Sequence, residues 1–517
     1  HEVEVVSLAG NEKDSSIDGS IKQSLGDVTI HRVYWSQALD ELNLFLISAP
    51  TSHFVLKSGL ALWRKFLSLH QANPFDVVEA PEHLAGAIHQ SVTKIAPLLV
   101  TLHTPHFKFV ADNLHSVTAS FDNQLICMLE RLSLICADVV ACPSRDLAGF
   151  VAQDTGYALE KIEFIRNPVD TKSFSPKGPQ ALAKDEERVR VLFVGRLESR
   201  KGIQDLIEAI PQILKECSNV EFVIVGADTN TATNQSSMKA FLLERLKKNG
   251  CTANVNFISH VELTDMPQYY RCADICVVPS LYDNAPYTCI EALASGKPVV
   301  ASTAGGAKEY VANEKYGLIV PPGDPQKLAR ALITLASDKA LRESYGRAAR
   351  EFALAELGLE TYVENKIALY KMAIKRYEKN KAARLYMLPP EQSLLDSVEL
   401  LCAFDRMTFE VLCQQSIEFR LKAWFRLLKK RPKLALLKTL RGLFNSLPAP
   451  ILQNTLGSRL TGYLDRTISQ KEPPPFGFSR QWAQIQDRSG PAATAIANPQ
   501  TDLAITSAER IKSTDSF

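Results

Sequence analysis

The sequence predicts an α/β protein with two doubly wound, Rossmann-like domains followed by a helical extension. Short apolar segments rich in β-branched residues alternate with helical stretches as far as residue 380. This alternation is typical of parallel sheets covered by helices. A segment rich in proline and polar residues, 167–188, interrupts the pattern, which then begins again. The 517 residues are enough for about three domains.

The first predicted domain spans residues 1–175 and should contain one parallel sheet with helices on both faces. Helical stretches include 58–70 and 116–136. Strands are expected at 3–8, 28–33, 77–79, 98–102, 139–143 and 162–165. Because the sequence starts with His1 and enters a strand at once, we expect that an upstream segment has been removed.

The second predicted domain spans residues 185–358, and a helix at 359–380 should return to the first domain. The expected strands are 189–194, 220–225, 255–258, 275–279, 298–301 and 317–320. The expected helices are 202–215, 238–248, 267–271, 290–295 and 325–337. Two such domains would face a ligand cleft lined by the carboxyl ends of their strands.

Composition excludes several classes of protein. The net charge of +2 argues against a general nucleic-acid binder. No apolar run reaches the roughly 18 residues of a membrane span. Ten cysteines without a CxxC pair favour buried thiols in a reducing, cytoplasmic compartment over a disulfide framework or a zinc site.

The C-terminal region has a different residue pattern, without the alternation of strands and helices. Residues 391–467 look helical, and within them 420–445 carries nine Lys/Arg and no acidic residue, interleaved with Trp, Phe and Leu. This segment is either an interfacial helix on the inner, anionic face of a membrane or a solvated helical module broken by Pro432. A nucleic-acid role is disfavoured, since no binding module accompanies the charge. Residues 468–517 are predicted to be a flexible linker or tail.

Two motifs in the second domain suggest chemistry. The first, VLFVGRLESRKG, runs from a strand into Gly195 and Arg196 and places Lys201 just before a helix. Two cations beside a helix start can hold a diphosphate, although a surface turn with solvated cations fits equally well. In the second motif, Asp283 precedes and Glu291 begins a predicted helix, so both carboxylates could accept hydrogen bonds from a polyhydroxylated ligand. A capping carboxylate and a surface aspartate would also explain this pair.

At this point the sequence resembles the family 4 retaining glycosyltransferases of the GT-B fold. The resemblance covers about residues 1–378. It is carried, in order, by HEVEVVS, FDVVEAPE, LVTLHTP, ADVVACPS, IRNPVD, VLFVGRLESRKG, VEFVIVG, CADICVVPS, DNAPYTCIEALASGKPVVAS, GGAKEYV and GLIVPPGD. That family normally begins with a strand, a glycine-rich loop and a helix before the strand that starts here, so the resemblance implies an N-terminally incomplete first domain.

The resemblance also implies roles for individual residues. Asp283 and Glu291 match the ends of the E-x7-E motif, the first at the donor sugar and the second at the ribose, with Asp one methylene shorter than the family's Glu. His103 matches a histidine at the mouth of the cleft, so the implied catalytic set is His103, Asp283 and Glu291. Gly305 and Gly306 match a turn facing the cleft. The implied donor-binding residues are Gly195, Arg196, Lys201, Pro286, Tyr287, Thr288 and Glu291.

No Asp-x-Asp pair occurs, so we expect cations and helix dipoles to stabilise the leaving diphosphate, with no metal or other cofactor. A His103–His106 metal pair is disfavoured because no third ligand stands out. The implied function is metal-independent transfer of a sugar from a UDP-, GDP- or ADP-linked donor, with retention, to a polysaccharide, lipid-linked saccharide or small metabolite. The alternatives are a GT-B epimerase or phosphorylase, and a non-catalytic glycosyltransferase-like scaffold or partner subunit.

Overall fold

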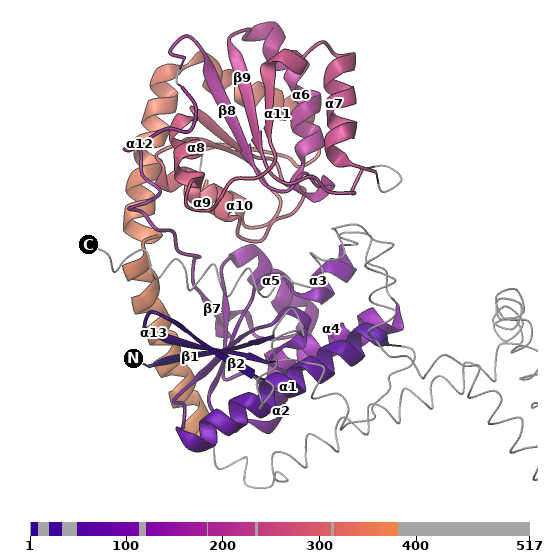
Figure 1. The fold of residues 1–517 in the computed structure, drawn as a ribbon, viewed down its shortest axis with the longest axis vertical. Helices are drawn as coiled ribbons and strands as arrows, with labels where there is room; N and C mark the ends of the chain where they lie inside the picture. The colour runs from indigo at the N-terminus through magenta and orange to yellow at the C-terminus, as the bar shows by residue number, and fades with distance from the viewer. Residues whose placement is uncertain are drawn as a thin grey trace, which may run out of the picture. The chain divides into compact units, whose positions relative to one another are not determined.

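The computed structural model describes residues 2–8, 20–33, 49–112, 120–183, 185–232, 236–311 and 315–380 (Figure 1). The predicted extension at 391–467, its basic segment 420–445 and the tail at 468–517 lie outside the described residues. Among the residues that are described, no helix is both long and apolar enough to cross a membrane.

The first domain contains two separate sheets. One has the order β1–β3–β2, formed by β1 (Val3–Leu8), β2 (Ser20–Leu25) and β3 (Val28–Val33). The other is wholly parallel with the order β4–β5–β6–β7, formed by β4 (Val78–Pro81), β5 (Leu98–Thr101), β6 (Val139–Cys142) and β7 (Ile162–Phe164). The expectation of a single parallel sheet was therefore wrong for this domain.

Strand β2 is an element that the sequence reading missed. It pairs antiparallel with β3, and a two-residue Gly26-Asp27 turn joins the two strands. Gly26 has a φ of 61°, which suits a tight hairpin turn. The Gly-Asp dipeptide between two alternating runs was the available signal.

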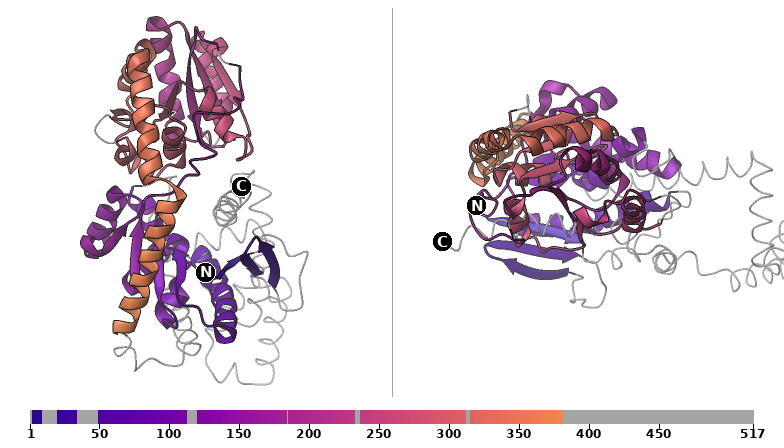
Figure 2. Two further views of the ribbon diagram at one scale, coloured as in Figure 1. Left: turned by 90° about the vertical axis from the view of Figure 1, so that its left-hand side faces the viewer. Right: turned by 90° about the horizontal axis from the view of Figure 1, so that it is seen from above.

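Helices pack against both sheets of the first domain. They are α1 (Pro50–Ala72), α2 (Ile88–Thr93), α3 (His106–Ala111), α4 (Phe121–Cys136) and α5 (Arg145–Thr155), with α1 on the strands β1 and β3. Phe107, Cys127 and Leu134 pack with the β-strand residues Val100 and Val140 in a buried core. On another part of the sheet, Leu369 and Ala373 of α13 (Leu359–Asn380) pack with residues of β5 and β6 (Figure 2).

The second domain is a doubly wound parallel sheet in the order β10–β9–β8–β11–β12–β13. Its strands are β8 (Val189–Val194), β9 (Val220–Val225), β10 (Val255–Ile258), β11 (Ile275–Val278), β12 (Val299–Ser302) and β13 (Gly317–Val320). The strand order reverses between β8 and β11, which pair directly. In open α/β sheets such a switch point is where ligands bind.

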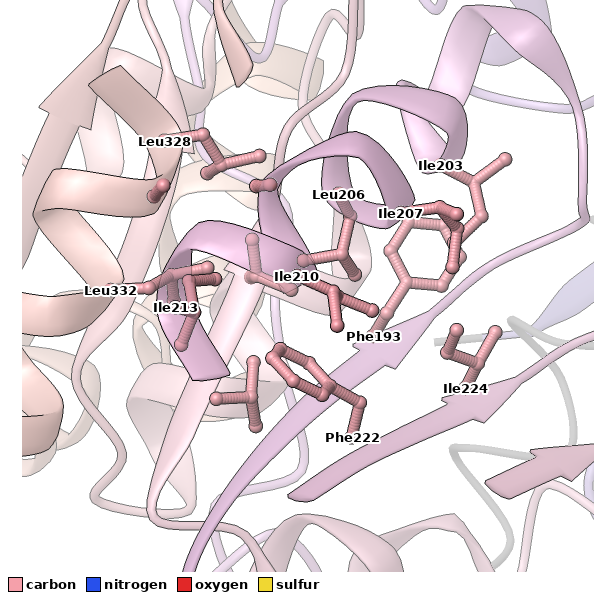
Figure 3. Close-up of a cluster of buried hydrophobic side chains, with 14 of the residues drawn as sticks. Phe193, Ile203, Leu206, Ile207, Ile210, Ile213, Phe222, Ile224, Leu328 and Leu332 are labelled. Carbon is pink, nitrogen blue, oxygen red and sulfur yellow. The ribbon is translucent and has the colours of Figure 1, made fainter. Parts of the chain in front are cut away.

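Two apolar cores flank this second sheet. One joins α6 (Ile203–Glu216) and α11 (Pro325–Ser337) to the strands, with Phe193, Ile210 and Phe222 at its centre (Figure 3). The other core contains residues from α8 (Met266–Cys272), α9 (Tyr287–Ala294), α10 (Ala307–Tyr310) and α12 (Lys339–Glu356). The remaining helix, α7 (Met238–Lys248), packs beside α6. The apolar spacing along α6 and α11 explains why both were predicted with nearly correct bounds.

The chain passes between the two domains twice, and the two passages touch. The Val169 amide donates to the Leu357 carbonyl at 2.8 Å, and Arg166 pairs with Glu356 at 3.1 Å. The segment after Val169, predicted as a linker, is fixed to the second domain: Arg271 and Arg350 both donate to its carbonyl oxygens.

The cysteines that the structure describes are all free thiols. Six of these eight are buried. Their burial agrees with the role expected from the sequence, small apolar side chains in a packed core.

Candidate functional site

The basic motif after β8 forms a compact turn at the switch point. Arg196 leaves the strand with its side chain half exposed and 3.3 Å from Glu198. A 3₁₀ turn follows at Ser199–Lys201, and Gly202 joins it to α6. Gly202 has a φ of 68°, and a Cβ there would lie 2.0 Å from the Pro279 carbonyl oxygen. Only glycine fits this approach, which holds the turn against the end of β11.

Lys201 and Asp283 are in direct contact. The Lys201 Nζ lies 2.5 Å from Asp283 Oδ2, and Arg200 Nη1 is 4.0 Å from the same oxygen. Burial alone would raise the pKa of Asp283, but Lys201 and Arg200 outweigh it and hold this pKa below its usual value. The family resemblance implies different parts of a donor for these two residues, whereas in the structure their side chains pair with each other.

Glu291 lies inside α9 and does not begin it, because the helix starts at Tyr287. Pro286 occupies the N-cap position of the helix, and Tyr287 and Thr288 lie in its first turn. The Glu291 carboxylate is buried and accepts a 2.9 Å hydrogen bond from the Tyr270 hydroxyl. Burial and the nearby Glu291 charge raise the pKa of Tyr270 well above its usual value, so Tyr270 remains a neutral donor.

The turn at Gly305 and Gly306 packs against the loop that carries Asp283. The Gly306 amide donates to the Asp283 carbonyl at 3.0 Å. A Cβ on Gly306 would lie 1.9 Å from the Asn284 carbonyl oxygen and 2.6 Å from Ser144 Cβ. This turn therefore supports the Asp283 loop through its backbone.

His103 follows β5 in the first domain. Its backbone N–H donates to both carboxylate oxygens of Glu82 at 2.8 Å, and its side chain is exposed. Partial dehydration by the surrounding protein still lowers the pKa of His103, as it lowers that of His83 to about 4. Both imidazoles are therefore neutral near pH 7. His106, the other member of the disfavoured metal pair, contacts Asn123 Oδ1 through Nε2 at 2.9 Å.

Two buried carboxyl groups beneath these histidines were missed by the sequence analysis. Glu82 is fully buried, and burial raises its pKa to about 8. Glu130 of α4 accepts from the Leu84 and Phe107 amides, and burial raises its pKa well above the usual value. The signal in the sequence was an acidic residue on the apolar face of an otherwise amphipathic helix. Both carboxyls fix loops that carry histidines.

Contacts between the domains join the His103 loop to the Asp283 loop. Asn284 donates through Nδ2 to the His103 carbonyl and accepts through Oδ1 from the Ser144 hydroxyl. Nearby, the Glu309 carboxylate accepts from the Arg145 and Asp146 amides at 2.9 and 2.8 Å. None of these contacts was predicted, since they depend on residues more than a hundred positions apart.

A cavity of about 340 Å³ is lined by Ser199, Gln204, Glu208, Thr231, Ala232, Met238, Phe241 and Arg245, and it includes none of the predicted site residues. Across the described part of the chain, no group of three or more His, Cys, Asp or Glu side chains is arranged to hold a metal ion.

Comparison with known families matches both domains. The family model "Glycosyltransferase Family 4" matches residues 1–173, and "Glycosyl transferases group 1" matches residues 175–352. Glycogen synthase from Mycobacterium tuberculosis (strain CDC 1551 / Oshkosh) is 26% identical over 341 residues, covering 64% of this chain and 77% of that protein. D-inositol 3-phosphate glycosyltransferase from Kribbella flavida is 29% identical over 222 residues, covering 41% of this chain and 51% of that protein.

Solved structures share the fold. Sucrose-phosphate synthase from Thermosynechococcus elongatus superposes with a TM-score of 0.55 at 23% identity, covering 72% of this chain and 88% of that one. Anabaena HepE, solved in complex with UDP, superposes with a TM-score of 0.50 at 21% identity, covering 61% of this chain and 83% of that one. With both domains matched in succession, and with glycosyltransferases among its relatives, the chain belongs to a GT-B glycosyltransferase family.

Proposed function

We propose that this protein transfers a sugar from a nucleoside-diphosphate donor to a hydroxyl acceptor, with retention at the anomeric carbon and without a metal. The observation that carries the proposal is the contact of Lys201 and Arg200 with Asp283, at the switch point between β8 and β11. Arg196 belongs to the same basic motif and is linked to Arg200 through Glu198. Cations are suited to a diphosphate, and a carboxylate is suited to sugar hydroxyls.

The roles of these side chains follow from their charge and position. Arg196 and Lys201 stabilise the negative charge that develops on the diphosphate as the bond from the anomeric carbon to phosphate oxygen breaks. The acceptor oxygen forms its bond on the same face, and the acceptor proton passes to the departing phosphate oxygen. Asp283 accepts a hydrogen bond from the donor sugar. Neither Asp283 nor Glu291 acts as a nucleophile.

Glu291 and His103 have supporting positions in the proposed site. Glu291 receives the ribose hydroxyls, sharing its oxygens with Tyr270. His103, a neutral imidazole at pH 7, faces the transferred sugar and can donate one hydrogen bond to it. The backbone at Pro286, Tyr287 and Thr288 opens α9 toward the donor. The relatives named above act on different molecules, so the acceptor remains a saccharide chain, a lipid-linked saccharide or a small metabolite.

The test uses the full chain with UDP-, GDP- and ADP-linked sugars, with and without EDTA. The proposal expects binding of one donor, product of retained configuration by NMR, and an unchanged rate in EDTA. An exposed control cation at the far end of α6, Lys215, should tolerate substitution by Ala, whereas Arg196→Ala should reduce transfer about 10²-fold or more. Loss of activity in EDTA would refute the metal-free mechanism.

The second candidate is a non-catalytic glycosyltransferase-like subunit. The pairing of Asp283 with Lys201 and of Glu291 with Tyr270 favours it, because each carboxylate already has a protein partner. This candidate expects no binding of any nucleotide sugar by calorimetry.

A peripheral location on the cytoplasmic face of a membrane is a separate proposal that depends on the basic segment 420–445. Co-sedimentation of the full chain with anionic vesicles checks it. Binding that weakens with salt is expected, and equal recovery with neutral vesicles would refute the electrostatic contact.

A further inference from the structure

We infer that Asn284 is a positioning residue that couples the His103 loop of the first domain to the donor-binding loop of the second. The inference rests on the proposed function, because it assigns a purpose to the contact between the two loops. Asn284 follows Asp283 directly in sequence, so one loop carries both the donor carboxylate and the interdomain amide.

The Asn284 side chain is only 4% exposed, and both ends of its amide are bonded. The Nδ2 group donates to the His103 carbonyl, and Oδ1 accepts from the Ser144 hydroxyl. The His103 carbonyl can only accept, so the amide orientation is fixed by the network. An asparagine serves both partners at once, which neither alanine nor an ionised aspartate can do.

Each partner of Asn284 is itself held in place. The His103 amide is bonded to buried Glu82, so this residue is fixed at its N–H and at its carbonyl while its ring stays exposed. The Ser144 hydroxyl also accepts from the Leu147 amide at the start of α5. Asn284 therefore joins two rigid points of the first domain to the loop of Asp283.

The two domains are also joined by contacts that do not involve Asn284, so a positioning role for Asn284 can be distinguished from merely holding the domains together. Lys308 pairs with Asp146 at 2.6 Å, and Glu309 accepts from two backbone amides of α5. Removing the Asn284 amide leaves these contacts intact. The expected loss is therefore the relative placement of His103 and Asp283, and displacement of reacting groups by about 1 Å can cost about 10²-fold in rate.

The experiment compares the full-length wild type with Asn284→Ala and Asn284→Asp. For Asn284→Ala we expect nucleotide-sugar affinity within about threefold of wild type and kcat for transfer reduced about 10²-fold. Asn284→Asp should be as slow at pH 8 but recover as the pH falls and its carboxyl gains a proton, because a neutral carboxyl can donate to the His103 carbonyl. Wild type should show no such recovery.

Amide hydrogen exchange gives a readout that does not need activity. Exchange at residues 102–107 should rise about tenfold in Asn284→Ala and return toward wild type in Asn284→Asp at low pH. If the wild type proves inactive, the proposed function fails, yet this exchange pattern still supports the positioning role. Equal loss of donor affinity and transfer, or unchanged exchange together with no acid recovery, would overturn the inference.

Discussion

The ammonium group of Lys201 lies 2.5 Å from the carboxylate of Asp283, so each of two residues assigned to a donor already neutralises the other. In the proposed reaction, Lys201 turns partly toward the diphosphate while Asp283 turns toward a sugar hydroxyl. The neighbouring cations hold the pKa of Asp283 below its usual value, so this carboxyl is ionised before substrate binds.

This pairing predicts different kinetic effects for its two members. Lys201→Ala should weaken binding of the nucleoside diphosphate itself, because the charge facing the phosphates is lost. Asp283→Asn should retain that binding but lower kcat about 10²- to 10³-fold, because the sugar loses an ionic acceptor. Calorimetry measures the affinity of each variant for the nucleoside diphosphate, and transfer kinetics measure its kcat. Equal changes of affinity and of kcat in the two variants would contradict the prediction.

Gly202 predicts a large loss of stability on substitution. In Gly202→Ala the new Cβ meets the Pro279 carbonyl oxygen at 2.0 Å, so the turn carrying Lys201 must move. Gly250 is a matched control, because its φ of 67° is almost the same and nothing lies within 4 Å of an added Cβ. We expect Gly250→Ala to lower the free energy of unfolding by about 1–2 kcal/mol. Gly202→Ala should lower it by about 3 kcal/mol or more, and urea unfolding measures both changes. Equal costs would show that the close approach is unimportant.

Buried Glu82 predicts a loss of stability at alkaline pH. Its folded pKa of about 8 lies above the usual 4.5, so its contribution is complete below about pH 4.5 and is lost as pH rises through 8. The melting temperature of the full chain should therefore fall between pH 6 and 9. The Glu82→Gln variant should have a lower melting temperature than wild type at pH 6, but its melting temperature should fall less steeply between pH 6 and 9. If the melting temperatures of the variant and of wild type fall equally with pH, Glu82 is not the cause of the alkaline loss of stability.

His89 predicts sensitivity to acid. Neither ring nitrogen has a hydrogen-bond partner, and burial lowers its pKa to about 3. Because the folded pKa is depressed, stability is lost as pH falls below the usual value of 6.5. His89→Leu should be close to wild type at pH 7 and more resistant to unfolding at pH 5. Urea midpoints at the two pH values measure this, and a parallel decline in both proteins would count against it.

The sequence was sufficient for the fold class and for most of the second domain. Its strands are continuous apolar runs bounded by turns, and α11 has the same bounds, Pro325–Ser337, in prediction and structure. The first domain was harder because β2 carries lysine and glutamine in a short hairpin strand that lacks a strong apolar pattern. Its antiparallel pairing with β3 was therefore missed.

The contacts within the candidate site could not be predicted from local sequence patterns. The sequence predicted site roles for Lys201 and Asp283, but it could not show that two residues 82 positions apart in the chain pair with each other. Asn284 looked like an ordinary turn residue, since asparagine is common in turns. Glu82 was equally inconspicuous, because the backbone amides that allow a buried carboxyl are supplied by loops from elsewhere in the domain.

The paired passages between the domains have a mechanical consequence. The two segments are joined to each other by the Val169–Leu357 hydrogen bond and the Arg166–Glu356 ion pair, so the domains are connected by a doubled strand of chain and not by a single one. A rotation of one domain against the other must therefore deform both segments together. The alignment of Asn284 with the His103 carbonyl thus depends on these connecting segments as well as on the site itself.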